Sequence, residues 1–191
     1  MQFKKQLFFL FLLVNFKALG QVTTQELFPN AENEITIIVD LKKAKDSRAT
    51  GLLGKSSDVY LWSGAGATET GSAFQYQPSG QTNFSAPFEK GKMTSLGNDV
   101  WSIKLIPRSY FSVPTGTPIV KLGLLLKSGD GKSQTEDFLL NLYAGSLGIK
   151  WLAPTEKFTL SEAGKTVKIR ATFSAKSNAE LRLGTTLIWR Q

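Results

Sequence analysis

The sequence contains no cysteine and no histidine among its 191 residues. Without cysteine the fold cannot be held by disulfides, so its stability has to come from a hydrophobic core. Without histidine the chain lacks the usual general base, the usual zinc ligand and every Ser–His or Cys–His catalytic pair. These absences exclude many hydrolase mechanisms and most zinc sites.

Motifs for nucleotide binding and catalysis are also lacking. There is no P-loop, no dinucleotide-binding fingerprint and no nucleophile elbow. The turn Ser128–Gly131 lacks the spaced carboxylates of a calcium loop, and Glu136 and Asp137 point to opposite faces of a predicted strand. We therefore expect no enzyme activity, no cofactor and no metal. A small glycan-active enzyme would need two carboxylates lining one cleft.

Basic charge is unevenly distributed along the chain. The formal net charge is +8, but three lysines lie in the first twenty residues. Residues 21–147 carry equal numbers of basic and acidic side chains, whereas residues 148–191 carry 8 basic and 3 acidic ones. A nucleic-acid-binding protein is expected to concentrate basic residues on its main domain. We therefore expect no nucleic-acid partner.

Residues 1–20 have the pattern of a secretory signal peptide. Two lysines precede the apolar run Leu7–Val14, and Ala18 and Gly20 occupy the small-residue positions of a cleavage site. The run is too short to span a bilayer, and no later stretch reaches the length of a transmembrane helix. We expect an exported protein, periplasmic, outer-surface or extracellular, with no membrane span once the signal peptide is removed.

The sequence does contain many short alternating segments with turn signals between them. This pattern predicts an all-β fold, an antiparallel immunoglobulin-like β-sandwich over residues 21–147. Its predicted strands are Glu34–Leu41, Val59–Ser63, Phe74–Tyr76, Asp99–Leu105, Ile119–Lys127 and Glu136–Tyr143. The last two form a predicted hairpin, and Gln21–Asn33 is expected to be a loose lead-in.

Residues 148–191 predict a short second β-sandwich module. Its predicted strands are Ile149–Leu152, Phe158–Leu160, Thr166–Phe173, Ala179–Gly184 and Leu187–Trp189. In the third of these, Val167, Ile169, Ala171 and Phe173 are expected to face inward, and Lys168 and Arg170 outward. A piece of about 45 residues buries little apolar area. We expect either that this piece leans on the first domain or that it is an incomplete module. A truncated gene, an orphaned accessory module and a complete protein all fit the sequence.

The Gly-rich segment 51–66 carries the first candidate binding residues. Its short strand places Val59 and Leu61 on one face and Tyr60 and Trp62 on the other. Tyr60 and Trp62 either form a stacking platform for a sugar ring or belong to a strand that is buried on both faces.

The loop-rich segment 67–92 supplies the other candidates. Tyr76 is expected to form a stacking platform together with Trp62, with Tyr60 and Gln77 beside them, and amide side chains such as that of Gln77 hydrogen-bond sugar hydroxyls. The alternative is that the aromatic residues of this segment cap the open end of the sandwich. We select Trp62, Tyr76, Tyr60 and Gln77 as carbohydrate-binding residues and assign Trp101 to the core.

Three stretches taken together resemble a known family. They are GLLGKSSDVYLWSGAG at 51–66, GKMTSLGNDVWSIKLIPRSYFSVP at 91–114 and IVKLGLLLKSGDGKSQTEDFLLNLY at 119–143. In that order they resemble the immunoglobulin-like, early-set N-terminal module of secreted proteins of Bacteroidetes-type bacteria. That module often precedes an alpha-amylase-family catalytic domain or stands in cell-surface proteins. The residues after Gly148 resemble the start of the second sandwich that commonly follows.

The resemblance implies a non-catalytic accessory role in handling alpha-glucan. We therefore expect a polysaccharide partner, bound by aromatic stacking. The alternative is a structural or adhesive sandwich that contacts another surface protein through an apolar patch or an open sheet edge.

Overall fold

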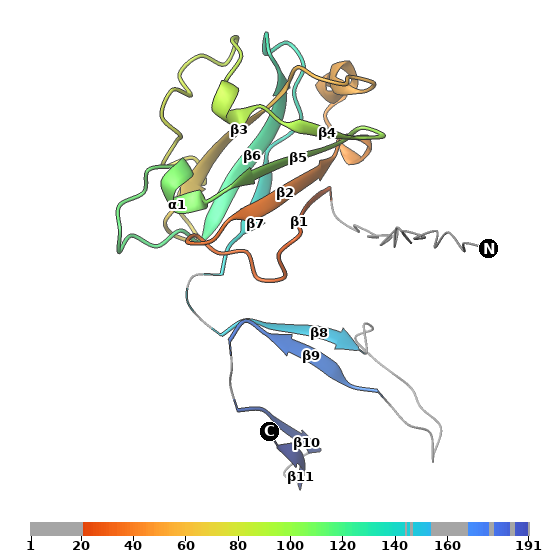
Figure 1. Ribbon diagram of the computed structural model, residues 1–191, viewed down its shortest axis with the longest axis vertical. Coiled ribbons are helices and arrows are strands. Elements are labelled where there is room, and N and C mark those ends of the chain that lie inside the picture. Colours follow the sequence, from red (N-terminus) through yellow and green to blue (C-terminus); the bar gives the residue numbers. More distant parts are fainter. Residues whose placement is uncertain are drawn as a thin grey trace, which may run out of the picture.

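The computed structural model describes residues 21–143, 145, 147–153, 168–175, 178–183 and 186–190. The expected signal peptide, the expected strand Phe158–Leu160 and the first two residues of the expected strand Thr166–Phe173 lie outside this part. Most regular structure in the described part is antiparallel strand (Figure 1), which confirms the predicted all-β fold. None of the described helices is long and apolar enough to cross a membrane.

The first sheet has four antiparallel strands in the order β1-β2-β5-β4. They are β1 (Val22–Thr24), β2 (Ile35–Asp40), β5 (Val100–Leu105) and β4 (Thr94–Gly97). The predicted lead-in Gln21–Asn33 is wrong in part, because β1 pairs with β2 and places Val22 opposite Val39.

The second sheet has three antiparallel strands in the order β3-β6-β7. They are β3 (Val59–Gly66), β6 (Lys121–Ser128) and β7 (Phe138–Asn141). The predicted hairpin is confirmed by the pairing of β6 with β7. The predicted strand at Phe74–Tyr76 is reduced to one isolated bridge between Tyr76 and Ala65.

The core lies between these two sheets, which face each other as two layers (Figure 1). Alternation along each strand sends every second side chain inward. The inward set includes Ile35, Ile37 and Val39 from β2, Trp101 and Ile103 from β5, Leu61 from β3, and Leu122, Leu124 and Leu126 from β6. The assignment of Trp101 to the core is confirmed by its complete burial.

The hairpin between β4 and β5 turns through Asn98 and Asp99, whose φ angles are 52° and 62°. Asparagine and aspartate tolerate this left-handed region, which a tight two-residue hairpin requires. The Asp99 carboxylate also accepts a hydrogen bond of 2.6 Å from the backbone N–H of Gly54. This contact fixes the loop that leads into β3.

In the described residues, helical structure is confined to short connections. These are η1 (Leu41–Lys43), η2 (Ser47–Leu52), η3 (Glu89–Gly91) and α1 (Pro107–Tyr110). Asp40 and Asp46 begin η1 and η2 by accepting backbone N–H groups two residues later. Proline at the first position of α1 is pre-set for helical φ and has no N–H to leave unpaired.

The described C-terminal residues form two separate two-stranded sheets. The first pairs β8 (Ile149–Ala153) with β9 (Arg170–Phe173), and the second pairs β10 (Glu180–Leu183) with β11 (Thr186–Arg190). Lys168 and Arg170 are exposed as predicted. Ile169 was expected to face inward, but it is 46% exposed, because no described residue covers it.

Candidate functional site

Strand β3 alternates as the sequence predicts. Val59 and Leu61 belong to the core between the sheets. Tyr60 and Trp62 lie on the outer face of the second sheet, where their strand partners are Lys127 and Leu125 of β6. Whether this face forms a stacking platform depends on what covers it.

Residues 67–92, the covering segment, lie over this outer face. Phe74 sits on the neighbouring residues Gly64 of β3 and Gly123 of β6, which are strand partners. A Cβ on Gly123 would lie 2.6 Å from the Phe74 ring and 2.9 Å from the Cβ of Ala73. The two glycines therefore make room for the covering segment, a role that the sequence analysis did not recognise.

The covering segment is tied to β3 by the side-chain amide of Gln81. Its oxygen accepts a hydrogen bond of 2.9 Å from the N–H of Ser63, and its nitrogen donates one of 2.8 Å to the Ser63 carbonyl. Gln81 is buried, so its amide satisfies backbone groups of β3 that water cannot reach. The Gln81 amide therefore makes the two hydrogen bonds with the Ser63 backbone that a residue of a neighbouring strand would make.

Tyr60 is only 5% exposed, which favours the alternative of a strand buried on both faces at this residue and leaves little of its ring surface for a sugar. The Lys127 ammonium lies 5.5 Å from the centre of the Tyr60 ring and 5.4 Å from that of Phe84. Both distances suit a cation–π contact. The ring of Tyr60 thus faces a buried cation instead of solvent.

Lys127 itself is fully buried without an ion-pair partner among the described residues. Its ammonium donates hydrogen bonds to the carbonyl oxygens of Ala86, Ser128 and Gly129. Burial lowers the pKa of Lys127, and the nearby carboxylates of Asp58 and Asp130 oppose that shift. The carbonyl groups take the place of water around this charge.

The remaining predicted residues do not join Trp62 in one platform. Trp62 is half-buried, with the Phe84 ring edge-on at 5.1 Å. Tyr76 is the bridge partner of Ala65 and packs against the core, so it points to the opposite side of the sheet from Trp62. Gln77 is exposed and follows Tyr76 on the covering segment.

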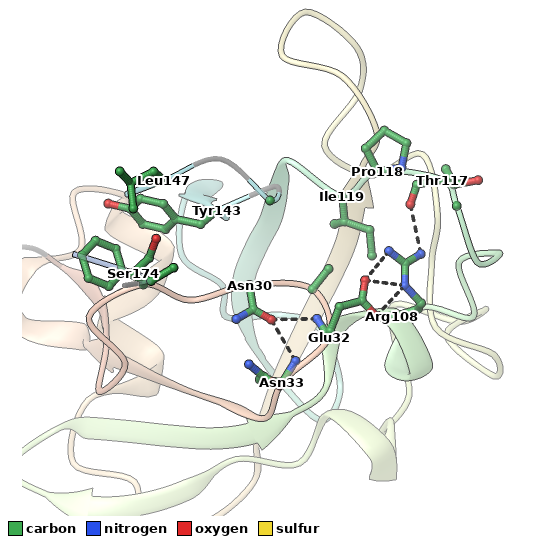
Figure 2. A pocket seen from close by; sticks show the side chains of 15 residues that line it. Asn30, Glu32, Asn33, Arg108, Thr117, Pro118, Ile119, Tyr143, Leu147 and Ser174 are labelled. Atoms are coloured by element: carbon green, nitrogen blue, oxygen red, sulfur yellow. Dashed lines mark hydrogen bonds and ion pairs between the residues drawn. The ribbon is translucent and has the colours of Figure 1, made fainter. Parts of the chain in front are cut away.

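A cavity of about 900 Å³ lies at one end of the sandwich, where the chain leaves it for β8. We call it the end cavity (Figure 2). Its walls come from segments far apart in the sequence: residues 28, 30–33, 108, 116–119, 143, 145, 147 and 174–175. No local pattern marks such a site, and the sequence analysis missed it.

One wall of the end cavity is aromatic. Phe28 and Tyr143 pack edge to face, with ring centres 4.9 Å apart, and both are half-buried. Tyr143 is held by a backbone hydrogen bond of 2.8 Å from its N–H to the carbonyl of Pro29. Gly148 fits closely against both rings, since a Cβ there would lie 2.5 Å from Tyr143 and 2.7 Å from Phe28.

The opposite wall contains an ion pair between Glu32 and Arg108 (Figure 2). The Nε of Arg108 donates to both carboxylate oxygens at 2.8 and 2.9 Å, and its Nη1 donates to the carbonyls of Pro114 and Thr117. These hydrogen bonds hold the pKa of the Glu32 carboxyl below its usual value. The pair is therefore charged but internally neutralised.

Polar groups without hydrogen-bond partners lie on both walls of the end cavity. The Asn30 side-chain oxygen accepts the N–H groups of Glu32 and Asn33, which leaves its amide nitrogen free. Within the part of the chain that the structure describes, the side chains of Asn33, Thr117 and Tyr143 make no hydrogen bond. The end cavity thus combines rings, free amides and free hydroxyl groups.

Catalytic and metal-binding arrangements are not found in the described residues. No three acidic residues gather there in a way that could hold a metal ion. Glu32 is the one carboxylate among the described residues that line the end cavity, whereas glycoside hydrolysis normally uses two.

Comparison with protein-family models found no match, and a search of curated proteins found no relative of this chain.

Proposed function

We propose that this chain is a non-catalytic accessory module that binds carbohydrate in the end cavity, with alpha-glucan as the ligand class. The observation that carries the proposal is the composition of the cavity, in which the rings of Phe28 and Tyr143 stand across from free amide and hydroxyl groups. Aromatic rings stack on the apolar faces of sugars, while amides and hydroxyls bind their hydroxyl groups. The neutralised Glu32–Arg108 pair favours an uncharged ligand.

The size of the end cavity supports a ligand larger than one sugar ring. Its volume of about 900 Å³ lies at the upper end of the range for small-molecule sites. The choice of alpha-glucan rests on the resemblance of residues 51–66, 91–114 and 119–143 to an accessory module of starch-active proteins. The signal-peptide pattern of residues 1–20 supports an exported location, where polysaccharide is encountered.

Affinity electrophoresis through native gels with soluble starch, with xylan or with no polysaccharide tests this proposal. We expect starch alone to retard the chain, and Tyr143→Ala to abolish the retardation because the aromatic wall is lost. Asn33→Ala should weaken it without affecting the fold, since this exposed side chain makes no contact that the protein needs. Circular dichroism of each variant verifies that it is folded.

Trp62→Ala is the matched control, since it removes a half-buried ring on a different face of the sandwich. Retardation that survives in Trp62→Ala and disappears in Tyr143→Ala supports the end cavity. The reverse result would move the carbohydrate site to β3. Equal mobility of the parent chain in all three gels would contradict the function itself.

A further inference from the structure

The sheet of β8 and β9, here called the ribbon, has one apolar and one basic face. Ile149 pairs with Phe173, and Trp151 with Ala171, so these four side chains share one face. Lys150 pairs with Thr172 on the other face. The register shifts after Trp151 and brings Arg170 opposite Ala153.

The apolar face of the ribbon is partly uncovered within the described part of the chain, since Ala171 and Phe173 are half-buried and their strand partners are exposed. Trp151 is 61% exposed and Ile149 is 49% exposed, whereas the inward residues of the sandwich are nearly all buried. Figure 1 draws the ribbon as a separate pair of arrows, apart from the two sheets of the sandwich. A sheet of two strands is marginal in water unless something packs against it or adds to it.

The ribbon also has open strand edges. Its sheet contains β8 and β9 alone, so each strand has one edge without a strand neighbour in the described residues. An unpaired edge accepts an extended segment of another chain through main-chain hydrogen bonds. The added strand continues both faces of the sheet.

The positive charge of the ribbon indicates what kind of extended segment would bind to its open edge. Lys150, Lys168 and Arg170 are exposed and make no ion pair with a described residue, and residues 147–153 and 168–175 contain no acidic side chain. A second copy of the chain would bring like charges together, which disfavours self-association. An acidic segment would neutralise them.

We propose that the ribbon binds an extended segment of another protein in which acidic and apolar residues alternate. Because side chains of a strand alternate between faces, such a segment places its carboxylates beside Lys150 and Arg170 and its apolar groups beside Trp151. The ribbon strands lie outside the end cavity, so this surface is independent of carbohydrate binding.

Fluorescence anisotropy with two labelled heptapeptides tests the proposal on the full chain. One peptide alternates Glu with Val, and the other alternates Lys with Val. We expect the Glu–Val peptide to bind, with affinity that falls as salt is raised, and the Lys–Val peptide not to bind. Equal binding of the two peptides, or no binding of either, would overturn the proposal.

Three variants locate the binding surface. Trp151→Ser should weaken binding of the Glu–Val peptide at least about tenfold, because the apolar contact is lost. Lys150→Glu with Arg170→Glu should reverse the preference in favour of the Lys–Val peptide. Lys92→Glu with Lys132→Glu changes the charge equally at two exposed sandwich sites and should leave the preference unchanged.

Two further results would contradict the proposal. One is undiminished binding of the Glu–Val peptide by Trp151→Ser. The other is a dimer in light scattering that Trp151→Ser converts to a monomer, since a second copy would then be the partner of the apolar face.

Discussion

The Lys127 ammonium donates a hydrogen bond of 2.9 Å to the carbonyl oxygen of Ala86. This contact joins β6 to the covering segment, and it belongs to a buried charge surrounded by main-chain carbonyls and two rings. The covering segment is therefore held on the outer face of the second sheet by contacts of a buried cation as well as by apolar packing.

Lys127→Met should destabilise the protein by about 2–4 kcal/mol, because it leaves buried carbonyl groups without a donor. Chemical denaturation measures the change in the free energy of unfolding. Lys132→Met is the matched control: that lysine is 85% exposed, its contact with Asp130 is 3.6 Å long, and its loss should cost little. If both substitutions changed the free energy of unfolding equally, the buried ammonium of Lys127 would stabilise the fold no more than the exposed one of Lys132.

The close fit of Phe74 on Gly123 predicts that the two residues are energetically coupled. Gly123→Ala places a methyl group against the Phe74 ring and should cost about 1–3 kcal/mol. In Phe74→Ala the ring is gone, so the same substitution should cost much less. A double-mutant cycle measures this coupling, and strictly additive effects would contradict the contact.

The strands of the sandwich could be predicted from alternation because burial on one face selects apolar residues at every second position. Strands β2 and β5 follow this rule, and their inward residues are buried as expected. β6 is buried along its whole length, because the covering segment lies over its outer face. β1 was missed because its three residues, Val22–Thr24, are too short and polar to show alternation.

Alternation could not predict that the covering segment lies over the outer face of β3. It depends on contacts of Phe74, Gln81 and Ala86 with residues distant in the sequence, and the covering segment has no periodic pattern. One signal was available: Gly64 and Gly123 face outward from neighbouring strands, and such glycines often mark the close approach of another backbone. No such signal in the sequence marks the end cavity, because the segments that form its walls come together only in the folded chain.

Because of Tyr110, we expect the stability of the fold to decrease as pH rises through the alkaline range. Burial raises the pKa of its hydroxyl to about 12, although the Ser63 side chain partly opposes the shift. The hydroxyls of Ser63 and Tyr110 nevertheless lack a partner with full hydrogen-bond geometry. Because the folded pKa exceeds the unfolded value of 10, stability is complete below pH 10 and is lost as pH rises toward 12.

Tyr110→Phe should remove this part of the alkaline loss, which amounts to about 2–3 kcal/mol. At neutral pH the variant should be as stable as the parent or more so, since a buried hydroxyl without a partner is deleted and the ring contact with Phe111 is kept. Denaturation curves between pH 8 and pH 12 measure the difference. Parallel pH profiles of parent and variant would rule out this role of Tyr110.

The last prediction concerns Glu136, whose carboxylate accepts the backbone N–H groups of Lys45 at 2.9 and 3.1 Å and of Asp46 at 3.1 Å. Burial alone would raise the pKa of Glu136. These hydrogen bonds together lower the pKa by more than burial raises it, so the net shift is downward from 4.5. A carboxyl with a lowered folded pKa contributes stability above its unfolded pKa and loses it as pH falls through the folded value. Glu136 therefore fixes the turn before η2 at neutral pH and releases it in acid.

Glu136→Gln should cost about 1 kcal/mol at pH 7, because a neutral amide is a weaker acceptor for two N–H groups. The difference from the parent should shrink as pH falls below 4.5, where the parent carboxyl also becomes neutral. Glu89→Gln serves as the control, since that carboxylate is 73% exposed and its only close cation is Lys92 at 3.7 Å among the described ion pairs. A constant difference between Glu136→Gln and parent from pH 7 to pH 3 would mean that the carboxylate charge does not hold this turn.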